Sequence, residues 1–142
     1  RDHSSATAEI RLQSLQETQI ENASIVVLNY TLQFIPDKER LKILTHIARG
    51  LVPGGILILS EKIRFMDEAT QNATTELHHA FKKHQGYSDL EIAQKRASLE
   101  NVLVPNTLEQ HQERLRDAGF ISSDMFLKCF NFVSLIAIKQ RE

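Results

Sequence analysis

Ala23-Ser24-Ile25-Val26-Val27-Leu28 and a second apolar run, Ile56-Leu57-Ile58-Leu59, determine the fold class of this chain. The first stretch is continuously apolar after its start and β-branched in its middle, which is typical of a central parallel strand buried on both faces. Between the runs, apolar residues recur at helical spacing until Gly50, so we expect a helix with Asp37 as its N-cap. Pro53-Gly54-Gly55 then predicts a turn. Strand, helix, turn and strand in this order form a right-handed βαβ crossover, and the fold class is therefore α/β.

The chain between Met66 and Gly119 has the pattern of polar helices with no strand between them. Two capping boxes, Ser88-Asp89-Leu90-Glu91 and Thr107-Leu108-Glu109-Gln110, mark helix starts, because in each the first hydroxyl and the fourth side chain satisfy free backbone N–H groups. We interpret this region, about 66–119, as a helical insertion in a single partial domain, 1–142. After it, residues 125–130 and 132–138 are rich in aromatic and β-branched side chains and predict an antiparallel hairpin.

Composition limits the classes of function. The 142 residues are 42% hydrophobic and 25% charged, which is typical of a globular domain. Lys and Arg number 17 against 18 Asp and Glu, so the chain lacks the basic excess of a strong nucleic-acid binder and we expect no direct nucleic-acid partner. No apolar run reaches the roughly 18 residues of a membrane span, so we expect no membrane partner. The lone Cys129 favours a cytoplasmic location, and its place in a hydrophobic strand predicts a buried, inert thiol.

The histidines His78, His79 and His84 make a weak case for a metal site. Adjacent histidines on a helix point in different directions, and the helical spacing offers no His or Cys partner that completes a ligand set. We therefore expect no metal.

Three polar groups are candidates for chemistry because of their positions. In an open α/β sheet, ligands bind beyond the carboxyl ends of the parallel strands. Asn29 follows the first strand, where it either holds a ligand through its donor and acceptor or satisfies its own loop. Ser60-Glu61-Lys62 follows the second strand, where it either lines a site or caps the strand end, and capping is the favoured interpretation. Arg96 lies on a predicted helix, where its guanidinium either binds a carboxylate through two hydrogen bonds or is simply solvated.

The string from Ala23 to Leu59 contains Val-Val-Leu-Asn-Tyr, Leu-Gln-Phe and Leu-Val-Pro-Gly-Gly, and it resembles the second half of an S-adenosylmethionine-dependent methyltransferase domain. Over nearly all of its length from about Ala8 onward, the chain is similar to the carboxy-S-adenosyl-L-methionine synthase family in particular. The motifs that carry this resemblance are Ser60-Glu61-Lys62, His78-His79, Phe81-Lys82, Gly86-Tyr87-Ser88, Glu91-Ile92, Gln94-Lys95-Arg96, Leu99-Glu100-Asn101-Val102 and Cys129-Phe130-Asn131-Phe132. The resemblance implies the carboxyl-terminal half of a Rossmann-like methyltransferase fold, with parallel strands, a helical insertion and a terminal hairpin.

The same resemblance implies an activity. It implies an enzyme that converts S-adenosylmethionine and prephenate to carboxy-S-adenosylmethionine and phenylpyruvate, whose product serves a partner enzyme that modifies the wobble uridine of tRNA. It also implies a homodimer. By this resemblance Asn29 contacts the adenosyl ligand, and Arg96 grips the carboxylate that distinguishes the product from S-adenosylmethionine. The group that acts as a base stays open among Tyr30, Glu61 and His79.

Two features depart from the family pattern. The family has Asp followed by Ile near the adenine where this sequence has Ser14-Leu15, so the acidic contact to the base is missing or replaced. The sequence begins Arg1-Asp2-His3 and runs into the strand-like Ala8-Glu9-Ile10-Arg11-Leu12, while the family's glycine-bearing first βα turn lies before this start. We therefore expect part of a longer protein that is inactive alone. The alternatives are a non-catalytic self-association module and an ordinary S-adenosylmethionine-dependent methyltransferase.

Overall fold

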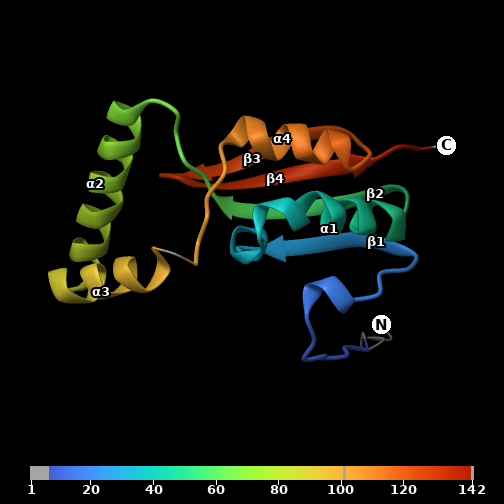
Figure 1. The fold of residues 1–142 in the computed structure, drawn as a ribbon, viewed down its shortest axis with the longest axis horizontal. Helices are drawn as coiled ribbons and strands as arrows, with labels where there is room; N and C mark the ends of the chain where they lie inside the picture. The colour runs from blue at the N-terminus through green and yellow to red at the C-terminus, as the bar shows by residue number, and fades with distance from the viewer. Residues whose placement is uncertain (1–6, 101, 142) are drawn as a thin grey trace, which may run out of the picture.

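The computed structural model describes residues 7–100 and 102–141, so Arg1-Asp2-His3 and Asn101 lie outside the described residues. Figure 1 shows a sheet that is accompanied by helices α1 and α4, with the helices α2 and α3 projecting beyond one end of it. The elements in chain order are η1 (Leu15–Glu17), β1 (Ala23–Asn29), η2 (Leu32–Phe34), α1 (Asp37–Gly50), β2 (Leu51–Lys62), α2 (Glu68–His84), α3 (Asp89–Leu99), α4 (Leu108–Asp117), β3 (Phe120–Cys129) and β4 (Phe132–Lys139).

The sheet is mixed, and within the described residues its strand order is β1-β2-β4-β3. Strands β1 and β2 are parallel, with Asn29 opposite Ser60 at their carboxyl ends. Strand β4 runs antiparallel to both β2 and β3. The predicted parallel unit and the predicted hairpin are therefore both confirmed, and the fold is α/β. Strand β3 begins earlier than expected, at Phe120, because its first half pairs with the far end of β4 as far as Lys139.

Strand β1 lies at an edge of the sheet, so the prediction of a central strand is wrong for the described part of the chain. Alternation along the strand places Leu28 in the core at 6% exposure, whereas Ile25 and Val27 on the opposite face are 60% and 52% exposed. The central positions belong to β2 and β4. An unbroken apolar run indicates a strand that can be buried on both faces, but it does not determine how many neighbours that strand finds.

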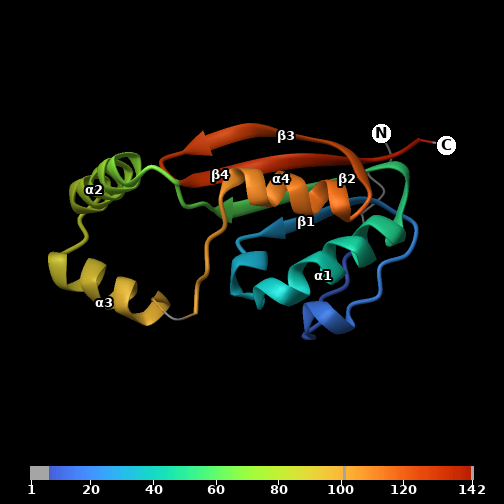
Figure 2. The same cartoon turned by 45° about the horizontal axis from the view of Figure 1, so that its top comes forward.

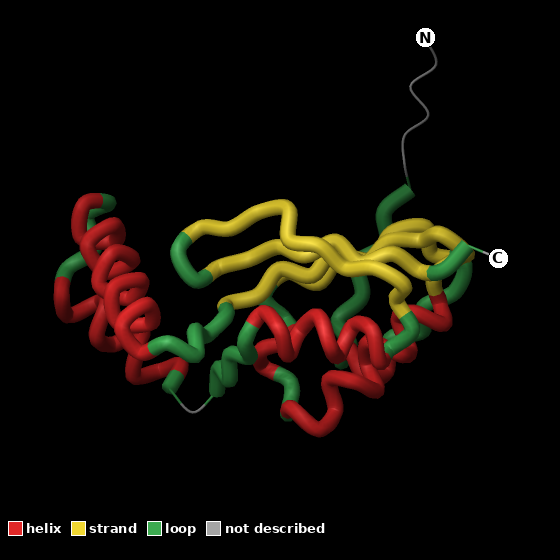
Figure 3. Tube along the Cα trace, turned by 90° about the horizontal axis from the view of Figure 1, so that it is seen from above, coloured by secondary structure: helices red, strands yellow, loops and turns green. Residues whose placement is uncertain are grey.

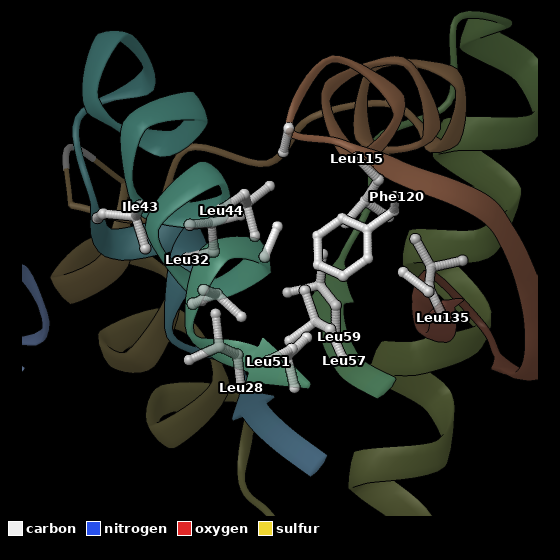
Figure 4. Packing of buried hydrophobic residues seen from close by; sticks show 14 residues of the cluster. Leu28, Leu32, Ile43, Leu44, Leu51, Leu57, Leu59, Leu115, Phe120 and Leu135 are labelled. Carbon is white, nitrogen blue, oxygen red and sulfur yellow. The ribbon is translucent and has the colours of Figure 1, made fainter. Parts of the chain in front are cut away.

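The core lies between the sheet and the helices α1 and α4, which Figures 2 and 3 show on the same side of the strands. Helix α1 contributes Ile43, Leu44 and Ile47 because positions three and four residues apart share one face of a helix. Figure 4 shows these side chains and those of the strands turned toward a common interior, where Leu57 and Leu59 are fully buried. Burial of one such side chain contributes about 1.5–3 kcal/mol, so this layer is the main source of stability.

The segment Pro53-Gly54-Gly55 lies inside β2 and not in a turn before it. The register of β1 against β2 shifts between Ala23 and Ile25, which is the signature of a local irregularity in the strand pair. Gly54 has a φ of 73°, which a residue without a side chain adopts at little cost. Strand β2 therefore begins directly where α1 ends, and the glycines allow it to bend rather than to turn.

Asp37 is the first residue of α1 and not its cap, because Pro36 holds the N-cap position. The Asp37 carboxylate is engaged elsewhere. It accepts hydrogen bonds from the Asn106 amide at 3.1 Å and from the Arg114 guanidinium at 3.0 Å. These contacts come from residues distant in sequence, so the local capping pattern could not reveal them.

Two further predictions are wrong. Residues 8–12 form no strand, and Ile10 and Leu12 among them are almost wholly exposed. Cys129 is exposed rather than buried, because it is the last residue of β3 and lies opposite Phe132 at the end of the hairpin.

The region 66–119 is helical as predicted, and both capping boxes are present, at Ser88 with Glu91 and at Thr107 with Gln110. Helix α4 packs against α1 and β3, whereas α2 and α3 lie beyond the strand ends (Figure 1). Among the described residues, no helix combines the length and the apolar character needed to cross a bilayer.

Leu57→Ala should lower the free energy of unfolding by about 2–5 kcal/mol, because truncating this fully buried side chain leaves a cavity in the core. Ile121→Ala is the matched control on exposed β3 and should change that free energy by less than about 0.5 kcal/mol. Urea unfolding followed by circular dichroism measures both. Equal losses in the two variants would contradict the assigned core.

Candidate functional site

A cavity of about 290 Å³ lies between α2, α3 and the end of β2. The carboxyl ends of β1 and β2 point toward these two helices (Figure 1), which is the edge at which open α/β sheets bind ligands. The basic and imidazole side chains in its lining are Lys62, His78, His79, Lys82, Lys95 and Arg96. Residues of three separate elements therefore line the cavity, and its charged side chains are mostly basic.

Helix α3 presents Arg96 to the cavity for a simple geometric reason. Ile92, Arg96 and Leu99 are four and then three residues apart, so they share one face of the helix, and all three line the cavity. Ile92 is 7% exposed and anchors that face. The capping box at Ser88 determines where the helix begins and thus which residues fall on this face. Arg96 therefore lines a cavity, although its residue as a whole is exposed.

The charges of the cavity repel one another. Burial lowers the pKa of Lys62, and the neighbouring charges of Lys82 and Arg96 lower it further. Burial also lowers the pKa of His78 to about 4, with added effects of Lys82 and Lys62. The pKa of His79 is lowered by burial and then by Lys82 and Arg96. Both imidazoles are therefore neutral near pH 7, and the positive charge of the cavity comes from the lysines and the arginine.

Asn29 ends β1, is exposed, and does not line the cavity that contains Arg96. The two predicted ligand contacts therefore lie in neighbouring places. They are connected by aromatic contacts, because the Tyr30 ring meets Phe132 edge-on with centroids 5.8 Å apart, and Phe132 meets His78 at 5.2 Å. The roles of Asn29 and Arg96 stay predictions.

Ser60, Glu61 and Lys62 are the last residues of β2 and do not follow it, and Glu61 caps the neighbouring turn η2 instead of its own strand end. Its buried carboxylate accepts the backbone N–H groups of Leu32 and Gln33, each at 2.9 Å, and so holds the turn η2. Burial raises the pKa of Glu61 to about 7, although these two N–H groups and the charge of Arg40 favour the ionised form. Of the three residues considered as a base, Glu61 is thus the one whose carboxylate already accepts two backbone hydrogen bonds.

The other two members of that group have different environments. The Ser60 hydroxyl forms a hydrogen bond of 2.8 Å with the Ser134 hydroxyl on β4. The backbone N–H of Lys62 donates to the Gln33 side chain at 2.9 Å, while the Lys62 side chain lines the cavity. One strand end therefore supplies a cap, a sheet contact and a charge for the cavity.

Arg40 is a structural residue that the sequence interpretation did not identify. Its guanidinium is fully buried and donates to the carbonyls of Ile35 at 2.9 Å, Gln33 at 3.2 Å and Val104 at 2.9 Å, and to the Asn106 side chain. These bonds hold the connection between α3 and α4 against η2. A signal did exist in the sequence, because Arg40 is four residues before Leu44 and so falls on the apolar face of α1.

No protein-family model matches the chain. It is 57% identical over 126 residues to the carboxy-S-adenosyl-L-methionine synthase of Citrifermentans bemidjiense, which covers 89% of this chain and 52% of that protein. It is 61% identical over 125 residues to the synthase of Geobacter metallireducens, covering 88% of this chain and 51% of that protein. The chain thus spans about half the length of these curated relatives.

Solved structures of low sequence identity share the fold. Human N-acetylserotonin methyltransferase in complex with SAM matches with a TM-score of 0.62 and 16% identity over 97% of this chain and 36% of that one. PigF with SAH matches with a TM-score of 0.55 and 17% identity over 87% of this chain and 32% of that one. At this level of identity the similarity supports the architecture, and it adds no information on the ligand of this chain.

Glu61→Gln should change how stability depends on pH. The folded pKa of about 7 lies above the ordinary 4.5, so the contribution of Glu61 to stability is fully present below pH 4.5 and is lost as the pH rises through 7. Glutamine does not titrate, so the stability of the unsubstituted chain relative to the variant should fall by about 3 kcal/mol from pH 4.5 to 8. His78 and His111, with pKa values lowered to about 4, give the opposite slope in both proteins and cancel. Urea unfolding across this pH range tests it, and a flat difference would show that Glu61 titrates normally.

Proposed function

Because the chain belongs to the carboxy-S-adenosyl-L-methionine synthase family, of whose members it spans about half, we propose that it forms part of a transferase that converts S-adenosylmethionine and prephenate to carboxy-S-adenosylmethionine and phenylpyruvate. The observation that carries this proposal is sequence identity: more than half of the aligned residues are identical to those of the two synthases, and each alignment covers most of the chain. The basic cavity at the carboxyl end of β2 supports it, since both the substrate and the distinctive part of the product are carboxylates.

Two residues have proposed roles in ligand binding. Asn29, at the end of β1, contacts the adenosyl part through its side-chain amide, which offers both a donor and an acceptor. Arg96 binds the carboxylate that distinguishes the product from S-adenosylmethionine. A planar guanidinium forms two parallel hydrogen bonds with a carboxylate and fixes its direction as well as its charge. Arg96 is therefore the residue to which we assign the catalytic contact.

The proposed reaction balances without an added reagent. A carboxylate of prephenate leaves as carbon dioxide, and the electron pair of the broken C–C bond makes the ring aromatic as the ring hydroxyl departs. The methyl group of S-adenosylmethionine loses a proton, which combines with that hydroxyl as water. The resulting sulfonium ylide forms a new C–C bond with carbon dioxide. The protein's part is to hold the reactants in line and to stabilise charge.

The surroundings of the candidate bases narrow their roles. His79 lines the cavity and is neutral, so it can accept a proton. Glu61 is engaged with the backbone of η2 and is suited to shaping the site. Tyr30 has a φ of 51°, so the backbone changes direction directly after β1 ends. Among the three, His79 is the one that faces the cavity with a free proton acceptor.

The biological setting is inferred from the same family membership. We extend the proposal to a cytoplasmic homodimer whose product is used by a partner enzyme in modifying the wobble uridine of tRNA, without direct contact between this chain and nucleic acid. We further propose that the chain is inactive by itself. Ser14 would then contribute to the adenine site only through its backbone or hydroxyl, in place of an acidic side chain.

The chain alone, given S-adenosylmethionine and prephenate, should yield no carboxy-S-adenosylmethionine by mass spectrometry. A protein in which the chain is joined to the unmatched portion of the Geobacter metallireducens synthase should yield it, because the two are 61% identical where they align. Methyl transfer without carboxylated product from the joined protein would overturn the proposed function in favour of an ordinary methyltransferase.

In the joined protein, Arg96→Ala should weaken binding of carboxy-S-adenosylmethionine by about 10- to 100-fold, as expected for loss of charge-assisted hydrogen bonds. Affinity for S-adenosylmethionine should stay within about twofold, since that ligand lacks the added carboxylate. The affinity of the Arg96→Lys variant for carboxy-S-adenosylmethionine should lie between those of the unsubstituted protein and the alanine variant. Lysine keeps the positive charge but cannot form the two parallel hydrogen bonds of a guanidinium. Arg116→Ala, on α4 and outside the cavity, is the control. Equal weakening of both ligands by Arg96→Ala would remove Arg96 from the carboxylate site. Titration calorimetry measures all of these affinities.

A further inference from the structure

The cavity holds more positive charge than a single carboxylate requires. Lys62 at the end of β2, Lys82 on α2 and Arg96 on α3 all line it. Among the ion pairs found in the described part of the chain, none includes any of these three residues. Three elements thus bring these three cations, together with Lys95 of α3, to one cavity, and none of the four takes part in an ion pair found in the described residues.

Bringing like charges together is unfavourable, and the cost grows as the groups leave water. Lys62 is already half-buried. The imidazoles beside it are neutral and neither add charge nor remove it. Glu100 is the one carboxylate in the lining, so the basic side chains outnumber the acidic ones and the cavity has a net positive charge. A ligand with two negative charges would offset this repulsion better than a ligand with one.

We infer that Lys62 and Lys82 form a second anion-binding position beside Arg96, and that the cavity thereby selects dicarboxylates over monocarboxylates. This inference deepens the proposed function and rests on it for the identity of the substrate. Prephenate carries two carboxylates, one that leaves its ring as carbon dioxide and one that stays in phenylpyruvate. Arg96 holds the carboxyl group that is transferred, and the two lysines hold the one that stays.

The difference between the side chains fits this division. An arginine fork orients a planar group, which suits the carboxyl carbon that must meet a methyl group. Lysine ammonium groups act as point charges on flexible stems, which suits a carboxylate that must enter with substrate and depart with product. Neutral His78 also lines the cavity, and its ring packs against those of Phe130 and Phe132 with centroids 5.6 Å and 5.2 Å apart, so this part of the cavity has an apolar support from the β3–β4 hairpin.

The test measures binding and needs no turnover. The isotope-labelled 142-residue chain is titrated by NMR with benzylmalonate and with 3-phenylpropanoate, which differ only in the second carboxylate. Benzylmalonate should bind about tenfold more tightly, and Lys62→Gln or Lys82→Gln should each weaken it about tenfold while leaving 3-phenylpropanoate within about twofold. Lys82 is only partly buried on a helix without buried residues, so Lys82→Gln serves if Lys62→Gln fails to fold. Lys83→Gln is the matched control, because Lys83 is the next residue on α2, lies outside the cavity and pairs with Asp89.

Several results would overturn the inference. Equal affinity for benzylmalonate and 3-phenylpropanoate would do so. An equal loss of affinity for benzylmalonate in Lys83→Gln and in the two cavity variants would also do so, because it would indicate a general effect of charge. Tighter binding of inorganic phosphate than of benzylmalonate would assign the position to a phosphate group instead. If the joined protein forms no carboxy-S-adenosylmethionine while the preference for benzylmalonate holds, the proposed function fails and the dicarboxylate position stands.

Discussion

The buried guanidinium of Arg40 is the interaction on which the geometry of the candidate site depends. It donates to the carbonyls of Gln33 within η2 and of Ile35 directly after η2 and, 64 residues away in sequence, to Val104 on the connection between α3 and α4. A buried charge is tolerated only while its hydrogen-bond acceptors stay in place. An unpaired guanidinium in the apolar interior costs far more free energy than any one hydrogen bond contributes. The connection is further secured by the backbone bond from Val104 N–H to the Gln33 carbonyl at 3.0 Å. The position of Val104, on the connection that follows the helix carrying Arg96, is therefore determined by α1 and η2.

The same turn is held from its other side by a buried carboxylate. Gln33 donates its N–H to Glu61 and offers its carbonyl to Arg40, so η2 lies between an acid on β2 and a base on α1. Opposite charges separated by an ordered peptide dipole strengthen one another at low dielectric. The consequence is a rigid loop at the carboxyl ends of the parallel strands, which is where an α/β enzyme must position its reactants.

How much of this could be predicted from sequence depended on how local the cause was. The capping boxes at Ser88 and Thr107 and the βα unit are set by residues within a few positions of one another, and all were predicted. The edge position of β1, the exposure of Cys129 and the true partners of Asp37 depend on contacts between distant segments, so periodicity could not supply them. Arg96 was selected by resemblance, and the cavity around it became visible only when β2, α2 and α3 were brought together. Lys62 was a candidate only as part of the group at the end of the second strand, for which capping was the favoured interpretation, and Lys82 carried no chemical signal of its own, because a lysine on a polar helix is ordinarily solvated.

The placement of the charges outside the core has a physical reason. Helix α2 has no buried residue and α3 has one, Ile92, so this pair is held to the sheet by limited contacts such as that between the tilted rings of Phe81 and Phe130, whose centroids are 5.5 Å apart. Elements with few buried apolar contacts open more readily than the core does. Repulsion among the cations of β2, α2 and α3 favours that opening, and an anion that contacts all three elements opposes it, because it binds the closed arrangement and not the open one. In the proposed site, ligand binding and the packing of α2 and α3 against the strand ends are therefore coupled, since the charges to which we assign ligand recognition are the same charges whose repulsion loosens the two helices.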